Sequence, residues 1–323
     1  MDFRLEVVAK RRGGWFTRAD AIAAGYCDAD LRRRVASGRW IRITRGAYAE
    51  PGQPVDAMAA WEEASWRHQL AARAVYERLG GRAVISHQSA LLLHGIRVSD
   101  LDLRRVHVTR KAGAGRSDGA VCQHAASPPV DAVLEVGAVR TTTPARAVVE
   151  TARATTFPIA VSVVDQALHL RIATPEQLAD ALEAFARRAG IRTAERAVRF
   201  GDSRVESVGE SRLRIVFADA GLPAPLPQPE IRDQSGVVLA RVDFLFERYG
   251  VIVEFDGAVK YRDGGTAALV AEKAREDGLR DLGYQVVRVC WADLARPDVV
   301  VLRIRRAIAR SGPVSGYVTA TAL

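Results

Sequence analysis

The sequence predicts a mixed α/β (α+β) protein built from three parts. The chain has 323 residues, whereas one domain usually has about 100–200, so more than one folded unit is expected. Segments with the apolar spacing of a helix alternate along the chain with segments that have the two-residue period of a strand. Prolines and a glycine at 51–54 interrupt both patterns. We place the parts at 1–52, 53–200 and 201–312.

The composition favours a negatively charged partner. Lys and Arg number 47 against 38 Asp and Glu, which gives a formal net charge of +9. More than half of this excess lies in the first 50 residues, which hold eleven Lys or Arg and six Asp or Glu. A basic protein attracts polyanions such as nucleic acids.

The cysteines and the hydropathy pattern predict a cytoplasmic protein without a membrane anchor. Cys27, Cys122 and Cys290 lie far apart and form no C-x-x-C pair, so neither a disulfide framework nor a zinc ribbon is expected. The first residues carry acids where a signal peptide would be apolar. No later stretch reaches about 18 apolar residues without a charge.

Two short helices with a glycine turn between them predict a helix-turn-helix near the N-terminus. Thr17-Arg18-Ala19-Asp20 is a capping box, and the helix that it begins ends at Gly25. Asp28 is expected to cap the second helix, which ends at Gly38. The segment 40–48 then has the pattern of a β-hairpin, as in a winged helix.

The second helix carries a cluster of arginines. Leu31 and Val35 are four residues apart and are expected to face inward, so the three arginines between them lie on the outer surface. Guanidinium groups there can reach phosphates or guanine edges. The candidate nucleic-acid contacts on this helix and on the hairpin are Arg32, Arg33, Arg34, Arg42 and Arg45. The alternative is a solvated basic hairpin that only keeps the chain soluble.

Residues Trp15 to Tyr48 resemble the winged-helix domain at the start of AbiEi-type antitoxins, the DNA-binding partners in type IV toxin-antitoxin systems. The segment Ile85-Ser86-His87-Gln88-Ser89-Ala90, with Leu93-His94-Gly95, resembles the part that follows in that family. The resemblance implies operator binding on double-stranded DNA and repression. It also implies an antitoxin role for the middle region, with a cognate toxin as partner.

The middle part is expected to be a small α/β unit followed by helices. Apolar spacing predicts a helix over about 55–80, and Ser86 is expected to cap a short helix through Leu93. Strands are predicted at 83–85 and 105–109. A helix begins at Thr143-Pro144, and 158–200 is helical with a break near 174–175.

The last third is predicted to contain a helix, a strand hairpin and a further helix, strand and helix. Ser203-Arg204-Val205-Glu206 fits a capping box that opens a helix to about Asp219. After the hairpin come a helix near 266–282, a strand near 284–291 and a basic helix near 297–310.

Three carboxylates are expected to meet at the hairpin. A tight turn brings Asp243 back beside Glu254 and Asp256, and the last two share one face of a strand because they are two residues apart. Like charges so close repel each other unless a cation compensates them. Oxygen ligands of this kind suit Mg²⁺ or Mn²⁺, so these three residues are the candidate metal ligands.

Two further residues join the candidate catalytic set. Lys260, one of four lysines in the chain, follows Asp256 by four residues and can orient a metal-bound water and stabilise charge on a phosphate. Glu210 lies on the helix that ends near Asp219 and can reach the same centre. The alternative for Glu210 is an ion pair with Arg214 one turn later.

Residues 203–310 resemble the PD-(D/E)XK nuclease superfamily, within it the very-short-patch-repair-like endonucleases, and the helix and strand over 272–289 carry part of the likeness. The resemblance implies a restriction-endonuclease-like fold and metal-dependent DNA hydrolysis, with Asp243 as the motif aspartate and Glu254 and Asp256 as its E-x-D-G form. Asp256 replaces the usual lysine, so activity depends on Lys260. The alternative is a non-cutting domain in a transcriptional regulator.

Three histidines form a candidate zinc site. His87 and His94 are seven residues apart and His107 is near in sequence, a set that can bind zinc if it shares one surface. Capping and packing within a small α/β unit explain these residues without a metal, and this is the preferred interpretation. No G-x-x-x-x-G-K-[ST] motif is present, which argues against an ATP-driven mechanism of the P-loop type.

Overall fold

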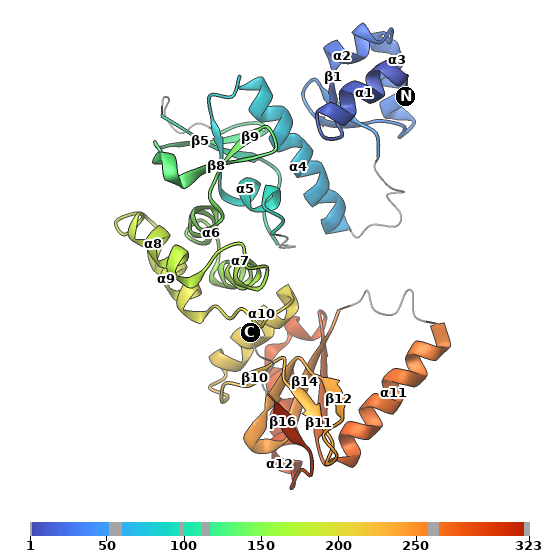
Figure 1. Cartoon of the computed structure of the whole chain (residues 1–323), viewed down its shortest axis with the longest axis vertical. Helices are drawn as coiled ribbons and strands as arrows, with labels where there is room; N and C mark the ends of the chain where they lie inside the picture. The colour runs from blue at the N-terminus through green and yellow to red at the C-terminus, as the bar shows by residue number, and fades with distance from the viewer. Residues whose placement is uncertain (1, 52–59, 97–99, 112–116, 258–264, 320–323) are drawn as a thin grey trace. The chain divides into compact units, whose positions relative to one another are not determined.

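The computed structural model describes residues 2–51, 60–96, 100–111, 117–257 and 265–319, and it has the predicted α+β class (Figure 1). The chain divides into two compact units. One contains Met1–Val163 and Ile172–Arg199, and the other contains Val164–Arg171 and Phe200–Leu323. The division into 1–52, 53–200 and 201–312 stays a prediction. None of the described helices is long and apolar enough to cross a membrane.

The N-terminal segment folds as a winged helix around aromatic rings. Its three strands form a sheet in the order β1-β3-β2. Phe16 and Trp40 meet edge to face at 4.8 Å, and Leu5 and Leu31 pack into the same core. The elements are α1 (Phe3–Arg11), β1 (Phe16–Thr17), α2 (Arg18–Ala23), α3 (Asp28–Ala36), β2 (Ile41–Thr44) and β3 (Ala47–Ala49). Helix α1 was not predicted.

One helix cap in this segment was predicted correctly and one was not. The Thr17 hydroxyl accepts from the Asp20 N–H and the Asp20 carboxylate accepts from the Thr17 N–H, so the predicted capping box is confirmed. Asp28 does not cap α3, because Cys27 occupies the N-cap position. The carboxylate of Asp30, the third residue of α3, accepts from the Cys27 N–H at 3.0 Å, which is the reciprocal bond of a capping box.

The rest of the first unit combines a six-stranded sheet with helices. The strand order is β6-β7-β5-β4-β9-β8, with β5 and β7 parallel. Its strands are β4 (Val84–Ile85), β5 (Val106–Arg110), β6 (Ser117–Asp118), β7 (Val121–Ala125), β8 (Val133–Val136) and β9 (Val139–Thr142). The helices are α4 (Ala60–Arg78), α5 (His87–Leu93), α6 (Pro144–Ala152), α8 (Pro175–Glu183) and α9 (Ile191–Phe200). Helix α7 (Phe157–His169) begins in this unit, and its residues from Val164 onward belong to the second unit. Ser86 is the N-cap residue of α5, as predicted, but its side chain makes no capping bond.

The second unit packs two small sheets with three helices. One sheet has the order β10-β13-β14-β15 and the other has the order β12-β11-β16. The strands are β10 (Leu226–Pro227), β11 (Glu230–Arg232), β12 (Val238–Arg241), β13 (Phe244–Phe246), β14 (Val251–Asp256), β15 (Gln285–Cys290) and β16 (Tyr317–Thr319). The helices are α10 (Val208–Asp219), α11 (Gly265–Asp281) and α12 (Pro297–Arg310).

Helix α10 begins four residues later than predicted. The proposed capping box at 203–206 is wrong, because Ser207 is the N-cap residue and its hydroxyl accepts from the Glu210 N–H. The motif Ser-x-x-Glu occurs at both positions, 203–206 and 207–210. Tertiary packing selects the second, where the Glu210 carboxylate accepts from the Glu206 N–H.

Strand β14 separates two hydrophobic cores. Val251, Val253 and Phe255 pack into the core that α10 and α12 cover. Ile252 points into the other core with Leu279 of α11. The alternation confirms that Glu254 and Asp256 face away from Val253 and Phe255.

Candidate functional site

Helix α3 presents its arginines as predicted, with one exception. Leu31 is 3% exposed and Val35 packs against the same core, so the inner face is confirmed. Arg32 and Arg33 are exposed. Arg34 is half-buried, with its guanidinium carbon 4.9 Å from the ring centre of Tyr26 and 5.0 Å from that of Trp40. Arg34 therefore contributes to the domain's packing, in addition to any contact with a ligand.

The surface hollow between α3 and the hairpin joins two of the candidate arginines. Arg32 lines it from the helix and Arg42 lines it from β2. The other lining residues include the paired Arg18 and Asp28 and the side chains of Leu31, Val35 and Tyr48. Arg45 is exposed at the turn between β2 and β3. The helix and the wing thus offer separate cations on either side of one concavity, a shape that suits a charged backbone.

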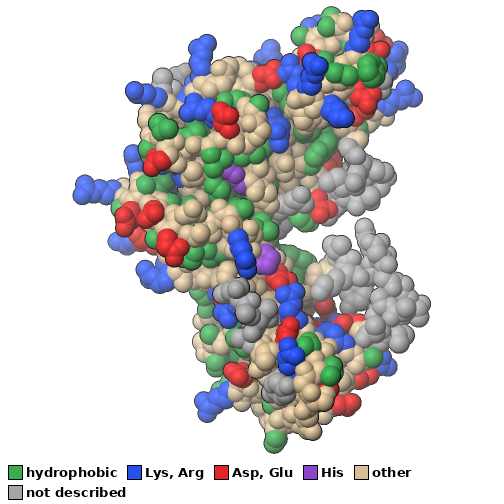
Figure 2. All heavy atoms as spheres, in the orientation of Figure 1, with side chains coloured by type: hydrophobic (Ala, Val, Ile, Leu, Met, Phe, Trp, Pro, Cys, Tyr) green, Lys and Arg blue, Asp and Glu red, His purple; other side chains and the backbone are tan. Residues whose placement is uncertain are grey.

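Acidic residues neutralise some of these cations. Arg18 forms two hydrogen bonds with the Asp28 carboxylate, at 2.7 and 2.5 Å, and Arg33 binds Asp30 at 2.5 Å. Among the residues that the structure describes, no carboxylate forms a salt bridge with Arg32, Arg42 or Arg45. Figure 2 shows Lys and Arg side chains interspersed with Asp and Glu on this part of the surface. The positive charge therefore lies at individual arginines and does not form one continuous patch.

Asp243 lies beside β14, as predicted. Strand β13 pairs antiparallel with β14, with Phe244 opposite Val253. The Asp243 Oδ2 atom accepts from the Phe255 N–H at 2.7 Å, and Oδ1 accepts from the Gln228 amide at 3.4 Å. The carboxylate is therefore held at the end of the hairpin by a backbone donor and a side-chain donor.

Glu210 reaches Asp243 and does not pair with Arg214. Its carboxylate is 6% exposed and accepts at Oε2 from the Gln228 amide and from the Glu206 N–H, each at 3.0 Å. Burial, reinforced by the negative charge of Asp243, raises the pKa of Glu210 to about 7. The alternative ion pair is wrong, because Arg214 binds the buried carboxylate of Asp165 at 3.1 Å.

Gln228 is a site residue that the sequence reasoning missed. Its side-chain amide donates to both Glu210 and Asp243, and the residue is 5% exposed. Its backbone has φ +53°, a conformation that non-glycine residues rarely adopt. A signal was present in the sequence, since Pro227 and Pro229 restrict the chain on both sides of a polar residue.

Arginines bind the other two carboxylates. Arg275 of α11 forms two bonds with Glu254, one to each carboxylate oxygen, at 2.8 and 2.9 Å. Arg288 lies opposite Glu254 in the parallel pairing of β14 with β15, and it contacts Asp256 at 3.4 Å. Both arginines also bind Glu272. The hydrogen bond from Arg275 is the main reason that the pKa of Glu272 falls to about 2. Sequence reasoning missed both cations.

The carboxylates do not fit a magnesium or manganese ion as they lie. Such an ion needs several oxygens that converge on it, but both oxygens of Glu254 are bound by Arg275 and Asp243 is bound by Phe255 and Gln228. In the described residues, the one group of three or more potential ligands with their atoms within 4.8 Å of one another consists of histidines. Lys260 lies outside the described residues. The metal and catalytic roles of Asp243, Glu254, Asp256, Lys260 and Glu210 stay predictions.

The histidines are arranged differently from the set that the sequence offered. His87 and His107 come together with His124, whereas the His94 Nε2 atom lies 2.8 Å from the Thr142 carbonyl oxygen. His124 was not considered. The pairing of β5 with β7 that brings it into place gives no signal in the local sequence.

The N-terminal fold and its exposed arginines define a winged-helix module. Residues 4–51 match a family model described as "Transcriptional regulator, AbiEi antitoxin", which agrees with the resemblance of Trp15 to Tyr48. The match ends before the C-terminal unit. The chain is also similar to uncharacterized proteins from two strains of Mycobacterium tuberculosis, each 28% identical over 280 residues, which cover 86% of this chain and 96% of the relative.

Proposed function

We propose that this protein is a DNA-binding transcriptional regulator that contacts double-stranded DNA through α3 and the β2–β3 hairpin. The observation that carries the proposal is the placement of Arg32 and Arg42 on opposite sides of one surface hollow, with Arg45 at the tip of the hairpin. The match of residues 4–51 to an antitoxin regulator family supports it independently.

The scaffold beneath these arginines is suited to holding them in place. Phe16, Tyr26 and Trp40 form a run of ring contacts under α3, and Arg34 covers two of these rings. A helix whose inner face is fixed in this way keeps its outer side chains in register with a groove. Arg32 on the helix and Arg42 on the wing are then available for phosphates, since no described carboxylate forms a salt bridge with either.

The test is a salt titration of DNA binding by the full chain, with the DNA upstream of its own gene and a random duplex as probes. Arg32→Ala and Arg42→Ala should each weaken binding about tenfold and reduce the slope of log K against log salt by about 1. Arg187→Ala is the matched control, because it removes the same charge from an exposed position on the segment after α8. Equal affinities for all four proteins, or binding that does not depend on salt, would contradict the proposal.

A cognate toxin is the protein partner that such a regulator is expected to have, and the name of the matched family supports this. The test is co-expression with the product of the adjacent gene, followed by growth measurement and co-purification. Growth inhibition by that product, relieved by this chain, is the expected result.

A second candidate function is phosphodiester hydrolysis by the C-terminal unit. The buried pair Glu210 and Asp243, bridged by the strained Gln228, favours it, because perturbed acids concentrate at functional sites. A cleavage assay on plasmid and single-stranded DNA with Mg²⁺ or Mn²⁺ tests it, with Asp243→Ala and Glu254→Ala as variants. Metal-dependent cleavage that both variants abolish would establish hydrolysis, whereas no cleavage by the wild type would leave DNA binding as the function.

A further inference from the structure

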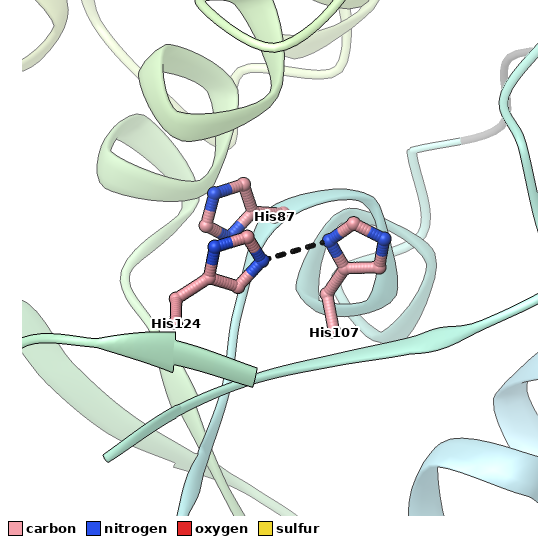
Figure 3. A group of neighbouring side chains, drawn as sticks. All are labelled: His87, His107 and His124. Atoms are coloured by element: carbon pink, nitrogen blue, oxygen red, sulfur yellow. Dashed lines mark hydrogen bonds between the residues drawn. The ribbon is translucent and has the colours of Figure 1, made fainter. Parts of the chain in front are cut away.

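Three histidines from separate elements meet in the first unit. His87 is the first residue of α5, His107 lies on β5 and His124 lies on β7. One ring nitrogen from each lies within 4.8 Å of the other two. Figure 3 shows the His87 and His124 rings stacked, with the His107 ring beside them and joined to His124 by a hydrogen bond. The His87 and His124 ring centres are 3.7 Å apart, and those of His107 and His124 are 5.1 Å apart.

The backbone explains why the rings converge. In the parallel pairing of β5 with β7, His107 lies opposite Cys122 and Thr109 lies opposite His124. Residues two apart on a strand share a face, so His107, Cys122 and His124 are on the same side of the sheet. His87 joins them through a backbone with φ +52°, which is rare for a residue other than glycine.

Buried polar and charged groups surround the rings. His87 is 5% exposed. The Glu150 carboxylate lies 3.7 Å from the His87 Nδ1 atom and also binds Arg146 at 2.9 Å. Arg153 and Arg105 also lie near the cluster, so a bound cation would have neighbours of both signs.

Polar neighbours hold the rings in place. The Ser86 hydroxyl lies 3.0 Å from the His87 Nδ1 atom, and the Gln88 amide lies 3.0 Å from the His107 Nε2 atom. Contacts of this kind to the second ring nitrogen orient the histidines of metal sites. The His107 Nδ1 and His124 Nε2 atoms are 3.0 Å apart and share one proton.

We propose that His87, His107 and His124 bind one Zn²⁺ ion and thereby tie the start of α5 to strands β5 and β7. Zinc bonds to imidazole nitrogen are about 2.0–2.1 Å long, so two ligands at tetrahedral angles lie about 3.3 Å apart. The 3.0 Å separation of the His107 and His124 nitrogens is close to this value. The stacked His87 and His124 rings, whose planes are 16° apart, have to rotate out of the stack for both lone pairs to meet one ion.

Zinc binding needs one tautomer change and no net loss of protons. The proton that lies between the His107 Nδ1 and His124 Nε2 atoms moves to the other nitrogen of the ring that carries it. Both facing nitrogens are then free to bind zinc. When this ring is His107, the proton sits on Nε2 and the Gln88 amide turns its oxygen toward it. Nitrogen donors, with the Cys122 sulfur 3.6 Å from the His124 Nε2 atom, favour zinc over Mg²⁺ or Ca²⁺.

The experiment is a calorimetric titration of the tag-free, chelator-treated full chain with Zn²⁺, together with Co²⁺ absorption spectra. We expect about one Zn²⁺ per chain, a visible Co²⁺ spectrum of tetrahedral type and a thermal midpoint that rises when Zn²⁺ is added. His124→Ala and His107→Gln should each weaken binding more than about 100-fold, beyond the loss usual for residues that only orient a ligand.

The matched control is His169→Gln, because His169 lies in the other unit and its Nδ1 atom contacts the Ser203 carbonyl oxygen. It should bind Zn²⁺ with unchanged affinity. Circular dichroism of the metal-free variants checks their folding. If His124→Ala does not fold, the Zn²⁺ affinity of His107→Gln is the test. Two results would overturn the proposal: a folded wild-type chain that takes up no stoichiometric Zn²⁺, or unchanged affinity in both histidine variants.

Discussion

The winged helix and the C-terminal unit use the same side chain for opposite purposes. In the winged helix, Arg32 and Arg42 are exposed beside a hollow and form no salt bridge with a described carboxylate. In the C-terminal unit, Arg275 and Arg288 bind four carboxylates, those of Glu254, Asp256, Glu272 and Glu276. A count of arginines therefore says little about nucleic-acid binding until the partner of each guanidinium is known.

The contrast also explains how acids so close together are tolerated in the C-terminal unit. Guanidinium groups bind the carboxylates of Glu254 and Asp256 and compensate their repulsion. Glu210 has no such partner among its described contacts, so its acid form is favoured and its pKa rises to about 7. The winged helix has no corresponding buried acid among its described core residues.

The largest effect that we expect is a pH dependence of the free energy of unfolding, caused by the buried carboxylate of Glu210. The pKa of Glu210 is about 7 in the folded chain and 4.5 in the unfolded chain, so its contribution to stability is complete below about pH 4.5 and is lost as the pH rises through about 7. The difference corresponds to about 3 kcal/mol in the free energy of unfolding. Urea denaturation between pH 5 and 8 measures it.

Glu210→Gln is the variant that isolates this effect. An amide keeps the shape and one acceptor oxygen but does not ionise, so the variant should lose less stability than the wild type over the same pH range. The same pH dependence in both proteins would show that the ionisation of Glu210 does not contribute to it.

The next largest effect tests the guanidinium network. Arg275→Ala leaves Glu254 next to Asp256 with only the more distant Arg288, and it should lower the free energy of unfolding by about 2–3 kcal/mol, less than a fully buried pair would lose because Arg275 is partly exposed. Denaturant titration of the full chain, with fluorescence and circular dichroism compared, measures it. Arg280→Ala is the control, because Arg280 is exposed and its partner Glu276 keeps its second bond, to Arg288. Equal losses in both variants would remove the distinction between the network and an ordinary surface pair.

Local chemistry made much of the fold predictable. Glycines after α2 and α3, the Thr17 capping box and the alternation along β14 depend on residues within a few positions of one another. The winged helix and the position of Asp243 beside β14 follow from such local signals. The two capping errors have different origins. The segments 203–206 and 207–210 carry the same Ser-x-x-Glu motif, whereas α3 begins one residue earlier than expected, with Cys27 as its N-cap and Asp30 as the third helical residue.

The contacts of the site residues were not predictable in this way. Arg275 reaches Glu254 because α11 packs over β14, and Arg288 reaches Asp256 because β15 pairs with β14 in a particular register. His124 meets His107 for a similar reason on β5 and β7. Such registers depend on the packing of whole elements, so the residue types at these positions could be noted from the sequence but their partners could not.

The smallest effect sharpens the comparison within one helix. Arg34→Ala removes a guanidinium that lies over Tyr26 and Trp40, and it should lower the free energy of unfolding by about 1 kcal/mol, as expected for cation–π contacts at a partly buried site. Arg32→Ala removes an exposed side chain and should change that free energy by less than about 0.5 kcal/mol. DNA affinity should follow the opposite order, because Arg32 lines the hollow and Arg34 is not among the residues that line it. Thermal denaturation and DNA titration of the two variants measure both orders. The prediction would be wrong if Arg34→Ala lost more DNA affinity than Arg32→Ala while its stability was unchanged. In that case the aromatic rings would orient Arg34 toward DNA, and α3 would not contain separate structural and DNA-binding arginines.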